Sequence, residues 1–456
     1  MNIPLSAQQK VSGAVFSQVA AGRCFDLLDL HAACPWRYPH LLQSCSHGPQ
    51  GRYDILFAFP GETLRLDSPA GDDFLAALDA WWQKERPPGP PDTDLPFSGG
   101  WFLYLGYELA AQIEPRLQLP LPDGALPTAL ATRFPAAVIH DSETNTRYIV
   151  AERQELIPLI EADIARLDES APAAQKIRLS PLHEAPAADY VDAVKRILAY
   201  IRDGDVFQVN LSCAWSAHIE EGFSDHQLFR RLRAANPGPF NGLASWPEGA
   251  IYSSSPERLV RVQGDRVETR PIAGTRPRGE GESRDRAFST ELLAHPKERA
   301  EHIMLIDLER NDLGRIAIPG TVRVDELMVL ESYATVHHIV SNVTARLRPE
   351  VTPGQVIRAV FPGGTITGCP KVRCMEIIAE LEAGARGAYT GSMGYLNRDG
   401  SMDLNILIRT IVRSGDQLGF RAGAGIVADS DPRRELEETR AKAQGMLRAL
   451  DALPAA

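Results

Sequence analysis

Two glutamates, Glu298 and Glu301, lie three residues apart in a segment whose pattern predicts a helix. Residues 297–308 contain no glycine or proline, and Leu305 and Leu308 follow on the same helical face. The leucines predict that this face is turned towards the protein interior. A carboxylate near a buried apolar stripe loses hydration and needs a compensating cation. Because the ligands are oxygens, the pattern favours Mg²⁺.

A second helix near the C-terminus repeats this arrangement. Asp431 followed by Pro432 is typical of a helix start, with an N-cap and then a proline at the first helical position. For either helix alone, a solvated charged surface is the better explanation. Taken together, and with the loops described below, the two helices favour a metal site. The face of the second helix is expected to contain Glu435, Glu438, Lys442 and Met446.

The composition is that of an ordinary globular enzyme. The 456 residues are 44% hydrophobic and 23% charged, which is enough apolar material for a large core. A net charge of -11 argues against nucleic acid or an anionic membrane surface as a partner. The six cysteines form no Cys-x-x-Cys pair and have no zinc spacing. Residues 1–10 lack a signal-peptide pattern, and no apolar run has the length of a membrane span, so we expect a cytoplasmic protein.

Predicted strands outnumber predicted helices along the chain. Helices are expected at 73–85, 154–167 and 189–202, a hairpin at 136–151, and strands at 206–212, 249–255, 258–263, 322–324, 391–395 and 417–422. Few strands are joined by crossover helices, so the expected class is α+β with large antiparallel sheets. The stretch 168–186, rich in Ala, Pro and Ser, is the candidate linker between an N-terminal region, 1–170, and a second region, 185–456.

Three segments are candidates for binding an anion. Residues 270–279 contain three arginines, which suit carboxylates, although a solvated loop explains them equally well. Residues 362–371 place a Gly/Thr loop before a helix, without P-loop spacing. Residues 423–428 imitate a dinucleotide motif, but no helix opens there, so only backbone N–H groups are expected to bind. An isolated histidine such as His338 is usually structural. The residues alone therefore predict a Mg²⁺ enzyme for a small polycarboxylate.

From residue 185 to residue 450, the chain strongly resembles the chorismate-utilising enzymes. The motifs that match are Gly204–Asn210, Ser254–Arg258, Pro271–Arg276, Glu301–His302, Asp307–Asp312, His338–Ser341, Gly364–Arg373, Gly394–Tyr395, Ile408–Thr410 and Gly423–Ile426. The resemblance implies a sandwich of two large antiparallel β-sheets with helices outside. It also makes 185–456 the chorismate-binding catalytic region.

Roles for individual residues are implied by this resemblance. Mg²⁺, which would hold the ring carboxylate of chorismate, is expected on Glu301 and Glu438, with Glu298 and Glu435 in support. The residues that match substrate-binding positions are Tyr395, Arg409, Gly423, Ala424, Gly425 and Lys442. The catalytic positions correspond to Glu257 and His338, as acid/base candidates, and to Gln208, Ala273 and Thr275.

Two of these positions distinguish reactions within the family. Gln208 stands where the water-using isochorismate and salicylate synthases resemble one another in having a lysine base. Ammonia needs no such base, so Gln208 favours a member that transfers an amine. Ala273 stands where many aminodeoxychorismate synthases have a lysine that attacks the ring, and alanine is usual in anthranilate synthases. Ala273 therefore argues against covalent catalysis.

Several other stretches resemble the aminodeoxychorismate branch. They are Pro39–Ser44, Arg52–Leu56, Leu95–Gly100, Gly106–Glu108, Thr365–Pro370 and Asp403–Leu407. Weighing these above one residue, we expect amination of chorismate at C4 with loss of the 4-hydroxyl. The product would be 4-amino-4-deoxychorismate, on the route to 4-aminobenzoate and folate. The alternative is the reaction of anthranilate synthase component I, which converts chorismate to anthranilate and pyruvate.

The resemblance also implies partners. The chain has no Gly-x-Cys-x-Gly elbow of a glutaminase, so ammonia is expected from a separate glutamine amidotransferase subunit. The N-terminal region of this family can hold tryptophan, although core packing explains the matching residues equally well. A non-catalytic tryptophan-sensing scaffold is a further alternative, but it would have lost the metal carboxylates. The residues in the matching stretches are Ser44, Arg52, Tyr53, Pro239 and Phe240.

Overall fold

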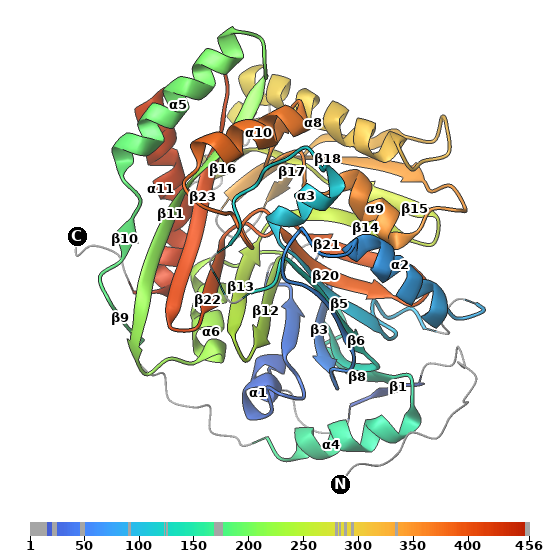
Figure 1. Ribbon diagram of the computed structural model, residues 1–456. Coiled ribbons are helices and arrows are strands. Elements are labelled where there is room, and N and C mark those ends of the chain that lie inside the picture. The colour runs from blue at the N-terminus through green and yellow to red at the C-terminus, as the bar shows by residue number, and fades with distance from the viewer. Residues whose placement is uncertain are drawn as a thin grey trace.

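The structure, a computed structural model, describes most of the chain (Figure 1). The described residues are 16–20, 25–45, 51–89, 93–122, 124, 126–167, 177–278, 281, 284–286, 290–292, 296–332 and 336–451. Within them, the strands form two sheets, one of 13 strands and one of ten, and all the pairings are antiparallel. The expected α+β class with two large antiparallel sheets is confirmed.

The first sheet contains strands from both ends of the chain. Its order is β1 (Phe16–Val19), β8 (Thr146–Ala151), β7 (Ala136–Asp141), β3 (Tyr53–Ala58), β2 (His40–Gln43), β12 (Phe240–Trp246), β13 (Gly249–Ser255), β22 (Thr410–Ser414), β23 (Gln417–Ile426), β11 (Gln208–Glu221) and β10 (His183–Glu184). Two short strands, β9 (Arg178–Leu179) and β19 (Gly368–Cys369), also pair with β11.

The second sheet is similarly mixed. Its order is β16 (Ile272–Pro277), β18 (Val336–Arg346), β15 (Arg266–Thr269), β14 (Arg258–Gln263), β21 (Met402–Asn405), β20 (Ser392–Asn397), β5 (Gly100–Leu105), β6 (Ala129–Phe134) and β4 (Thr63–Leu66), with β17 (Arg323–Ser332) paired to β18. The helices are α1 (Leu27–Ala33), α2 (Phe74–Glu85), α3 (Ala110–Ile113), α4 (Ile157–Ala165), α5 (Ala187–Arg202), α6 (Asp225–Ala235), α8 (Pro296–Gly314), α9 (Pro353–Val360), α10 (Lys371–Leu381) and α11 (Pro432–Ala449), with 3₁₀ turns η1 (Tyr107–Leu109) and η2 (Gln154–Leu156).

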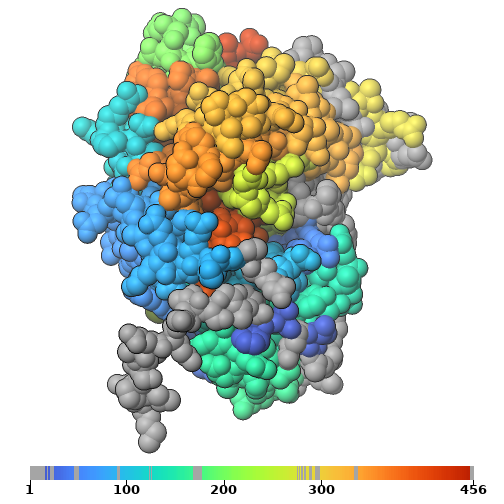
Figure 2. Space-filling model, turned by 90° about the vertical axis from the view of Figure 1, so that its right-hand side faces the viewer, coloured from blue at the N-terminus to red at the C-terminus, as the bar shows by residue number. Residues whose placement is uncertain are grey.

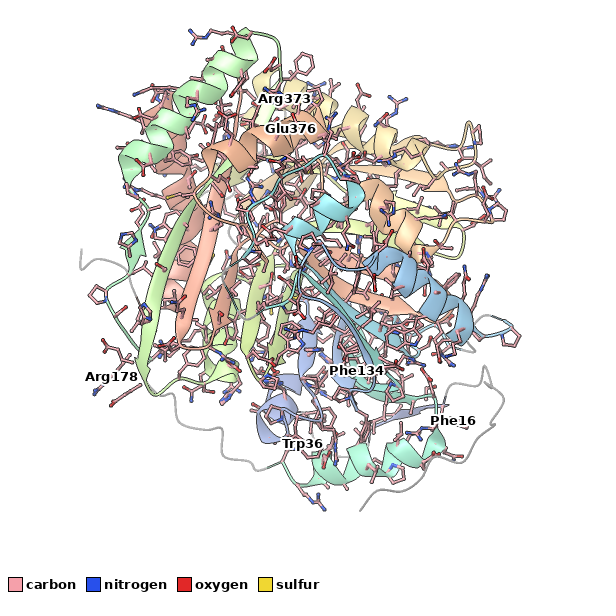
Figure 3. The ribbon with its side chains drawn as sticks, in the orientation of Figure 1. Phe16, Trp36, Phe134, Arg178, Arg373 and Glu376 are labelled. Carbon is pink, nitrogen blue, oxygen red and sulfur yellow. The ribbon has the colours of Figure 1, made fainter. Side chains whose placement is uncertain are left out.

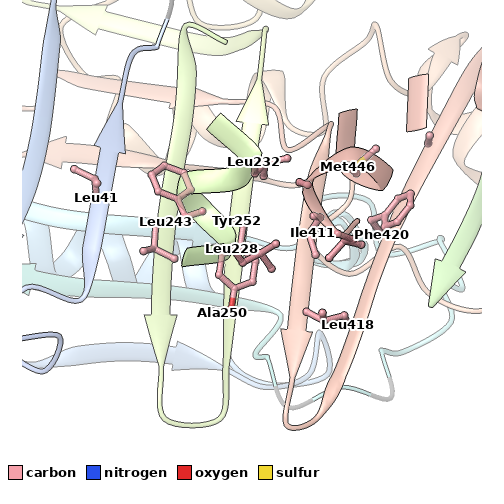
Figure 4. Packing of buried hydrophobic residues seen from close by; sticks show 14 of the residues in the cluster. Leu41, Leu228, Leu232, Leu243, Ala250, Tyr252, Ile411, Leu418, Phe420 and Met446 are labelled. Carbon is pink, nitrogen blue, oxygen red and sulfur yellow. The ribbon is translucent and has the colours of Figure 1, made fainter. Parts of the chain in front are cut away.

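Apolar residues form three layers around and between the sheets. Helices α1, α4, α5, α6 and α11 cover the outside of the first sheet, where Leu232 and Met446 belong to one cluster with Tyr252 and Ile411 (Figure 4). Helices α2, α8 and α9 lie side by side over the second sheet (Figure 2). A third cluster, which includes Phe134 (Figure 3), contains residues of both sheets. The two sheets are thus joined by a continuous apolar core.

The proposed division of the chain at 170–185 does not divide the sheets. β2 pairs with β12, and β5 pairs with β20, so each sheet joins the N-terminal region to the second region. In the expected linker, residues 168–176 lie outside the described part, and residues 177–186 include β9 and β10. A functional division into a regulatory and a catalytic region remains a prediction.

Local capping chemistry explains where the predicted helices begin. The Asp73 carboxylate accepts a hydrogen bond from Ala76 N (3.1 Å) at the start of α2, and Asp431 accepts two from Arg433 and Arg434 at the start of α11. The strand predicted at 322–324 is much longer, because β17 continues to Ser332. Most β17 side chains are at least partly exposed, so pairing with β18 and not a buried face keeps this strand in the sheet.

Two adjacent connections cross from one sheet to the other. Pro256 and Glu257 lie between β13 of the first sheet and β14 of the second, and residues 406–409 lie between β21 of the second and β22 of the first. Because β13 pairs with β22 and β14 with β21, the two connections run side by side. We call this place the double crossover. No helix in the described part of the chain is long and apolar enough to span a membrane.

Candidate active site

The double crossover brings two of the predicted residues together. The Ile406 amide donates a hydrogen bond to the Glu257 carbonyl (3.0 Å), and the Ser254 amide donates to the Arg409 carbonyl (3.1 Å). Arg409 has a φ of 52°, in the left-handed region that a non-glycine residue rarely adopts. The Ser254 hydroxyl also donates to the Arg409 carbonyl (3.1 Å). Backbone strain of this kind is often found where a side chain must be aimed at a ligand.

Glu257 is a buried carboxyl group that can hold a proton at neutral pH. Its side chain is 5% exposed, and burial raises its pKa to about 7, opposed by the neighbouring Thr365 hydroxyl, the Ile272 amide and the Arg409 guanidinium. Among the described residues, its Oε1 atom has no hydrogen-bond partner. Buried polar atoms are rarely left unsatisfied, so Oε1 is available for a ligand or a water molecule.

His338 lies on β18, beside the strand that contains Ala273 and Thr275. Burial and the nearby Arg409 together lower its pKa to about 3, against the opposing effect of the Gly274 backbone. The imidazole is therefore neutral near pH 7. Thr275 pairs with His338 in the sheet, and the register shifts between Ala273 and Thr275. Gly274, at this bulge, has a φ of 74°. The Ala273 methyl group is 7% exposed, and the Thr275 side chain lies outside the described part.

Helix α8 packs against this bulge through Glu298. The Arg276 guanidinium pairs with the Glu298 carboxylate (Nη1 to Oε1, 3.2 Å), and a Cβ atom added at Gly274 would lie 2.9 Å from Glu298 Oε2. Glu301 is half-buried one turn further along the helix. The sequence predicted that Leu305 and Leu308 face the interior, but only Leu305 is buried. This prediction was wrong in part, because the buried face of α8 is rotated from the expected one. The other buried residues on it include His302, Ile306, Glu309 and Leu313.

Helix α11 and strand β23 bring a second set of predicted residues together. Lys442 Nζ donates to the Gly423 carbonyl (3.1 Å) and pairs with the Glu438 carboxylate (2.8 Å). Glu438 is exposed, whereas Glu435 is 9% exposed. A Cβ atom added at Gly425 would overlap the Gln208 side chain, so the glycine allows Gln208 to lie against the β23 backbone. Ala424, between the two glycines, is buried and points into the apolar core.

The carboxylates predicted to hold a metal do not form a complete cage. Among the described residues, no three or more His, Cys, Asp or Glu side chains lie close enough together to hold an ion. Mg²⁺ is commonly bound by one or two carboxylates, with water and substrate oxygens completing its octahedron. Glu301 on α8 and Glu438 on α11 would supply the carboxylate oxygens that such an open site needs. Lys442 supplies the positive charge next to Glu438.

Tyr395 is placed elsewhere, in a cavity of about 470 Å³ that we call the second cavity, to distinguish it from the surroundings of Glu257. Its ring packs edge-on against Phe97, and its nearest charges are those of Asp403 and Arg261. All five residues proposed for a tryptophan pocket line this second cavity: Ser44, Arg52, Tyr53, Pro239 and Phe240. The structure therefore groups Tyr395 with the N-terminal pocket and not with Glu257 and His338. Instead, the Tyr389 hydroxyl lies beside Gly423.

A larger outer groove of about 890 Å³ lies between α3, α8, α9 and α10. The exposed side chains of Phe207 and Ile303 line it, as does Arg373, which pairs with Glu376 on α10 (Figure 3). None of the predicted site residues that the structure describes lines this groove. Volume alone would have pointed to it, but the buried acid and histidine lie elsewhere.

Two buried charged clusters were not among the candidate sites predicted from the sequence. In the first, the Glu382 carboxylate accepts hydrogen bonds from the Ser212 amide (2.8 Å) and from Arg386 (2.7 Å) and Arg421 (3.0 Å). Arg386 also donates to the carbonyls of Ile366 and Asn210. This cluster joins α10, β11, β23 and the 362–371 loop behind Gly423. Only a spacing of four residues between Glu382 and Arg386, at the end of a predicted helix, hinted at it.

The second cluster lies on the buried side of α8. Lys371 pairs with Asp312 (2.5 Å), and Glu309 lies one turn before Asp312. Burial and mutual repulsion raise the pKa of Glu309, and burial raises that of Asp312. Glu309 is close enough to Glu257 for the two carboxyl groups to interact electrostatically. A pattern search for alternating polarity misses these residues because they interrupt an apolar face.

The two-sheet fold, with a buried acid where the sheets are connected and a buried histidine on β18, defines a known class of protein. The sequence model for chorismate binding enzymes matches residues 43–448, and the chain belongs to this family. It is 42% identical over 442 residues to aminodeoxychorismate synthase component 1 of Bacillus subtilis, covering 91% of this chain and 92% of that protein. It is 40% identical over 433 residues to anthranilate synthase component 1 of Thermus thermophilus, covering 90% and 92%.

Solved structures agree with this assignment. Anthranilate synthase component I from Streptococcus pneumoniae superimposes with a TM-score of 0.77 at 32% identity, covering 88% of this chain and 93% of that one. The menaquinone-specific isochorismate synthase of Escherichia coli superimposes with a TM-score of 0.74 at 18% identity, which shows a shared fold. The chain is therefore a chorismate-utilising enzyme, and both aminodeoxychorismate and anthranilate synthases are among its relatives.

Proposed function

We propose that this enzyme replaces the 4-hydroxyl of chorismate with an amino group to give 4-amino-4-deoxychorismate, on the route to 4-aminobenzoate and folate. The observation that supports amination is Gln208, a neutral amide held against Gly425. A base would be needed at this position to activate water for attack on the ring. The C4 product is supported by the six sequence stretches of the aminodeoxychorismate branch and by 42% identity over 91% of the chain to the Bacillus subtilis protein.

The residues around the double crossover suit this reaction. Glu257 in its protonated form donates a proton to the 4-hydroxyl as the C–O bond breaks, so the oxygen leaves as water. Ammonia forms the new C–N bond with its lone pair, and the resulting ammonium returns a proton to the Glu257 carboxylate. Arg409 and the Gly423–Gly425 backbone bind substrate carboxylates. His338, neutral at this pH, is positioned to exchange a hydrogen bond with the substrate.

The metal requirement rests on Glu301 and Glu438, with Glu298 and Glu435 in support. Mg²⁺ bound there would hold the ring carboxylate and offset negative charge as the hydroxyl leaves. We expect Glu301→Gln to abolish Mg²⁺-dependent turnover while circular dichroism and the melting temperature stay near those of the parent protein. Arg310→Gln, which removes an exposed ion pair with Asp307 on the same helix, is the control. Full activity of Glu301→Gln would contradict the metal assignment.

A second candidate reaction is formation of anthranilate and pyruvate. It is favoured by Ala273, which is buried, pairs with Ile339 in the sheet and offers no nucleophile for covalent attack on the ring. In that case ammonia adds to the ring carbon next to the carboxylate, the 4-hydroxyl leaves as water, and pyruvate is then eliminated to give the aromatic ring. The two candidates share the acid, the metal carboxylates and the nitrogen source, and they differ in the carbon that receives the nitrogen.

Product analysis distinguishes the two reactions. The purified enzyme is incubated with chorismate, Mg²⁺ and an ammonium salt, with and without added aminodeoxychorismate lyase, and the products are separated by chromatography. We expect 4-aminobenzoate only when the lyase is present. Anthranilate formed without the lyase would overturn the proposal in favour of the second candidate.

Two partners belong to this proposal. Glutamine should support turnover only after a glutamine amidotransferase subunit is added, because the chain has no glutaminase elbow. Tryptophan is the proposed occupant of the second cavity, whose aromatic and charged lining suits an amino acid with an aromatic side chain. Titration calorimetry with tryptophan tests this, and substitution of Tyr53 by alanine should weaken any binding.

A further inference from the structure

Glu257, in the double crossover, and Arg258, the first residue of β14, have different surroundings. Glu257 is directed to the buried group that contains Arg409, Thr365 and the Ile272 amide, whereas Arg258 lines the second cavity. The register of β14 against β21 shifts between Arg258 and Val260, and such a bulge re-aims the side chains beside it. The chain therefore connects the acid and the second cavity through a single peptide unit.

Arg258 is among the most firmly held arginines of the second sheet. Its guanidinium donates two parallel hydrogen bonds to Asp403, from Nε (2.9 Å) and from Nη2 (3.0 Å). It also lies 3.7 Å from Glu268 and over the Phe240 ring, 5.1 Å from its centroid. The side chain is only 7% exposed. A two-point pair of this kind restricts rotation as well as translation.

Asp403 lies on β21, the strand that leads into the second connection of the double crossover. Two residues later, Asn405 accepts a hydrogen bond from the Met393 amide (2.9 Å), and the next residue, Ile406, donates to the Glu257 carbonyl. The Arg258–Asp403 pair thus closes a ring with the Ile406–Glu257 hydrogen bond. Both strands of the crossover are held at one distance by these two contacts.

We infer that Arg258 and Asp403 are positioning residues for Glu257. This inference rests on the proposed role of Glu257 as the proton donor. Arg258 does not touch the substrate in this arrangement; it acts by keeping the Glu257 backbone against Ile406. A molecule bound in the second cavity would contact the same ion pair, because Arg258 and Asp403 both line that cavity.

The groups around Glu257 determine how its pKa would change if the double crossover opened. Arg409 faces it from the second connection, Glu309 lies near it from α8, and His338 lies beyond Arg409. Glu257 is kept protonated by exclusion of water. If the crossover opens, water enters, the desolvation falls, and the carboxyl group loses its proton at a lower pH. The active, protonated form then disappears earlier as the pH rises.

The test compares three variants with the parent enzyme, using chorismate and an ammonium salt. Arg258→Gln and Asp403→Asn should each lower kcat by about tenfold with a KM within about twofold, since proton transfer and not substrate binding is affected. The pH at which kcat falls on the alkaline side should move down by about one unit. Arg261→Gln is the matched control, because Arg261 lies on the same strand and also pairs with Glu268, but not with Asp403. It should leave kcat and the pH profile unchanged.

Two further measurements keep the outcomes separate. Arg258→Lys retains the charge and should restore part of kcat, whereas a variant that is merely unfolded would show a lower melting temperature and no such rescue. If Glu257→Gln is fully active, the proposed function itself fails. If Glu257→Gln is inactive but Arg258→Gln and Asp403→Asn have the parental pH profile, the positioning inference is wrong and the proposed function stands.

Discussion

At the scale of single residues, burial determines the chemistry of the candidate site. Glu257 and His338 are both almost completely buried, and burial pushes the pKa of the acid upwards and that of the base downwards. His338 is therefore neutral near pH 7, and Glu257 changes its protonation state around that pH. A protonated acid suits proton donation to a leaving hydroxyl, and the Arg409 guanidinium is a charged group that acts on both Glu257 and His338.

The pH dependence of activity should follow Glu257. Because the protonated form is the active one, kcat should be constant below the pKa of Glu257, about 7, and fall as the pH rises above it. Glu257→Gln, which cannot donate a proton, should lose about 10²–10⁴-fold in kcat at all pH values. Steady-state rates from pH 5.5 to 9 check this. An alkaline limb that persists in a partly active Glu257→Gln enzyme would assign the titration to another group.

The same residue should also affect stability, with a defined sign. The folded-state pKa of Glu257 lies above its ordinary value of 4.5, so the folded protein binds the proton more tightly than the unfolded chain. This contribution is fully present below pH 4.5 and is lost as the pH rises through about 7. It amounts to about 3 kcal/mol. Glu257→Gln should therefore gain stability relative to the parent protein between pH 5 and pH 8, as measured by urea unfolding.

At the scale of elements, the bulge of β16 and the start of α8 form one unit. Gly274 has a positive φ and makes room for the Glu298 carboxylate, which in turn is held by Arg276. Neither feature can be read from the sequence, because a glycine between Ala273 and Thr275 is compatible with many turns. The two Glu-x-x-Glu helices were predictable from spacing, whereas the strand predicted to end at residue 422 continues through Gly423–Gly425. The relative placement of these elements was not predictable, since it depends on strand pairings far apart in the chain.

Some of the site was beyond sequence reasoning for the same reason. The cap at Asp431 is local, and the sequence predicted it correctly; Asp73, expected as the first helical residue, is the cap of α2. The rotation of α8, the position of Tyr395 in the second cavity, and the Glu382–Arg386 cluster all depend on tertiary packing. Patterns of polarity record which face is apolar. They do not record which cavity a side chain lines.

A glycine substitution tests the bulge. Gly274→Ala places a methyl group in a left-handed backbone and against Glu298, whereas Gly320→Ala places one at φ 82° with no atom within 4 Å. Both variants should lose about 1–2 kcal/mol of stability from the backbone strain. Only Gly274→Ala should also raise the Mg²⁺ concentration needed for half-maximal activity, because it displaces Glu298. Equal Mg²⁺ dependence in both variants would remove Glu298 from the metal site.

At the scale of the whole molecule, the two regions of the chain share both sheets, and each of the four apolar clusters of the described residues contains side chains from both regions. A ligand in the second cavity and one at Glu257 are therefore connected through a packed interior and not across a hinge between domains. Regulation, where it occurs, would have to act through small displacements of strands such as β14 and β21.

Unfolding should consequently be a single event. Leu103→Ala, in the N-terminal strand β5, removes a fully buried side chain of the second sheet and should cost about 2–5 kcal/mol. In calorimetry of the full chain, we expect one transition in the parent protein and one at lower temperature in the variant. Leu159→Ala, at an exposed position on α4, is the control and should change little. A second transition left unshifted by Leu103→Ala would mean that the region after residue 185 unfolds independently.

The shared sheets also have a consequence for biosynthesis. β5 leaves the ribosome about 290 residues before its partner β20 is made, and β2 must wait similarly for β12. During this interval, apolar strands with unpaired edges are exposed to the surrounding solution. Slow translation or an excess of unfinished chains should then favour aggregation, and chaperones that bind extended apolar segments should protect the nascent chain until β20 has been synthesised.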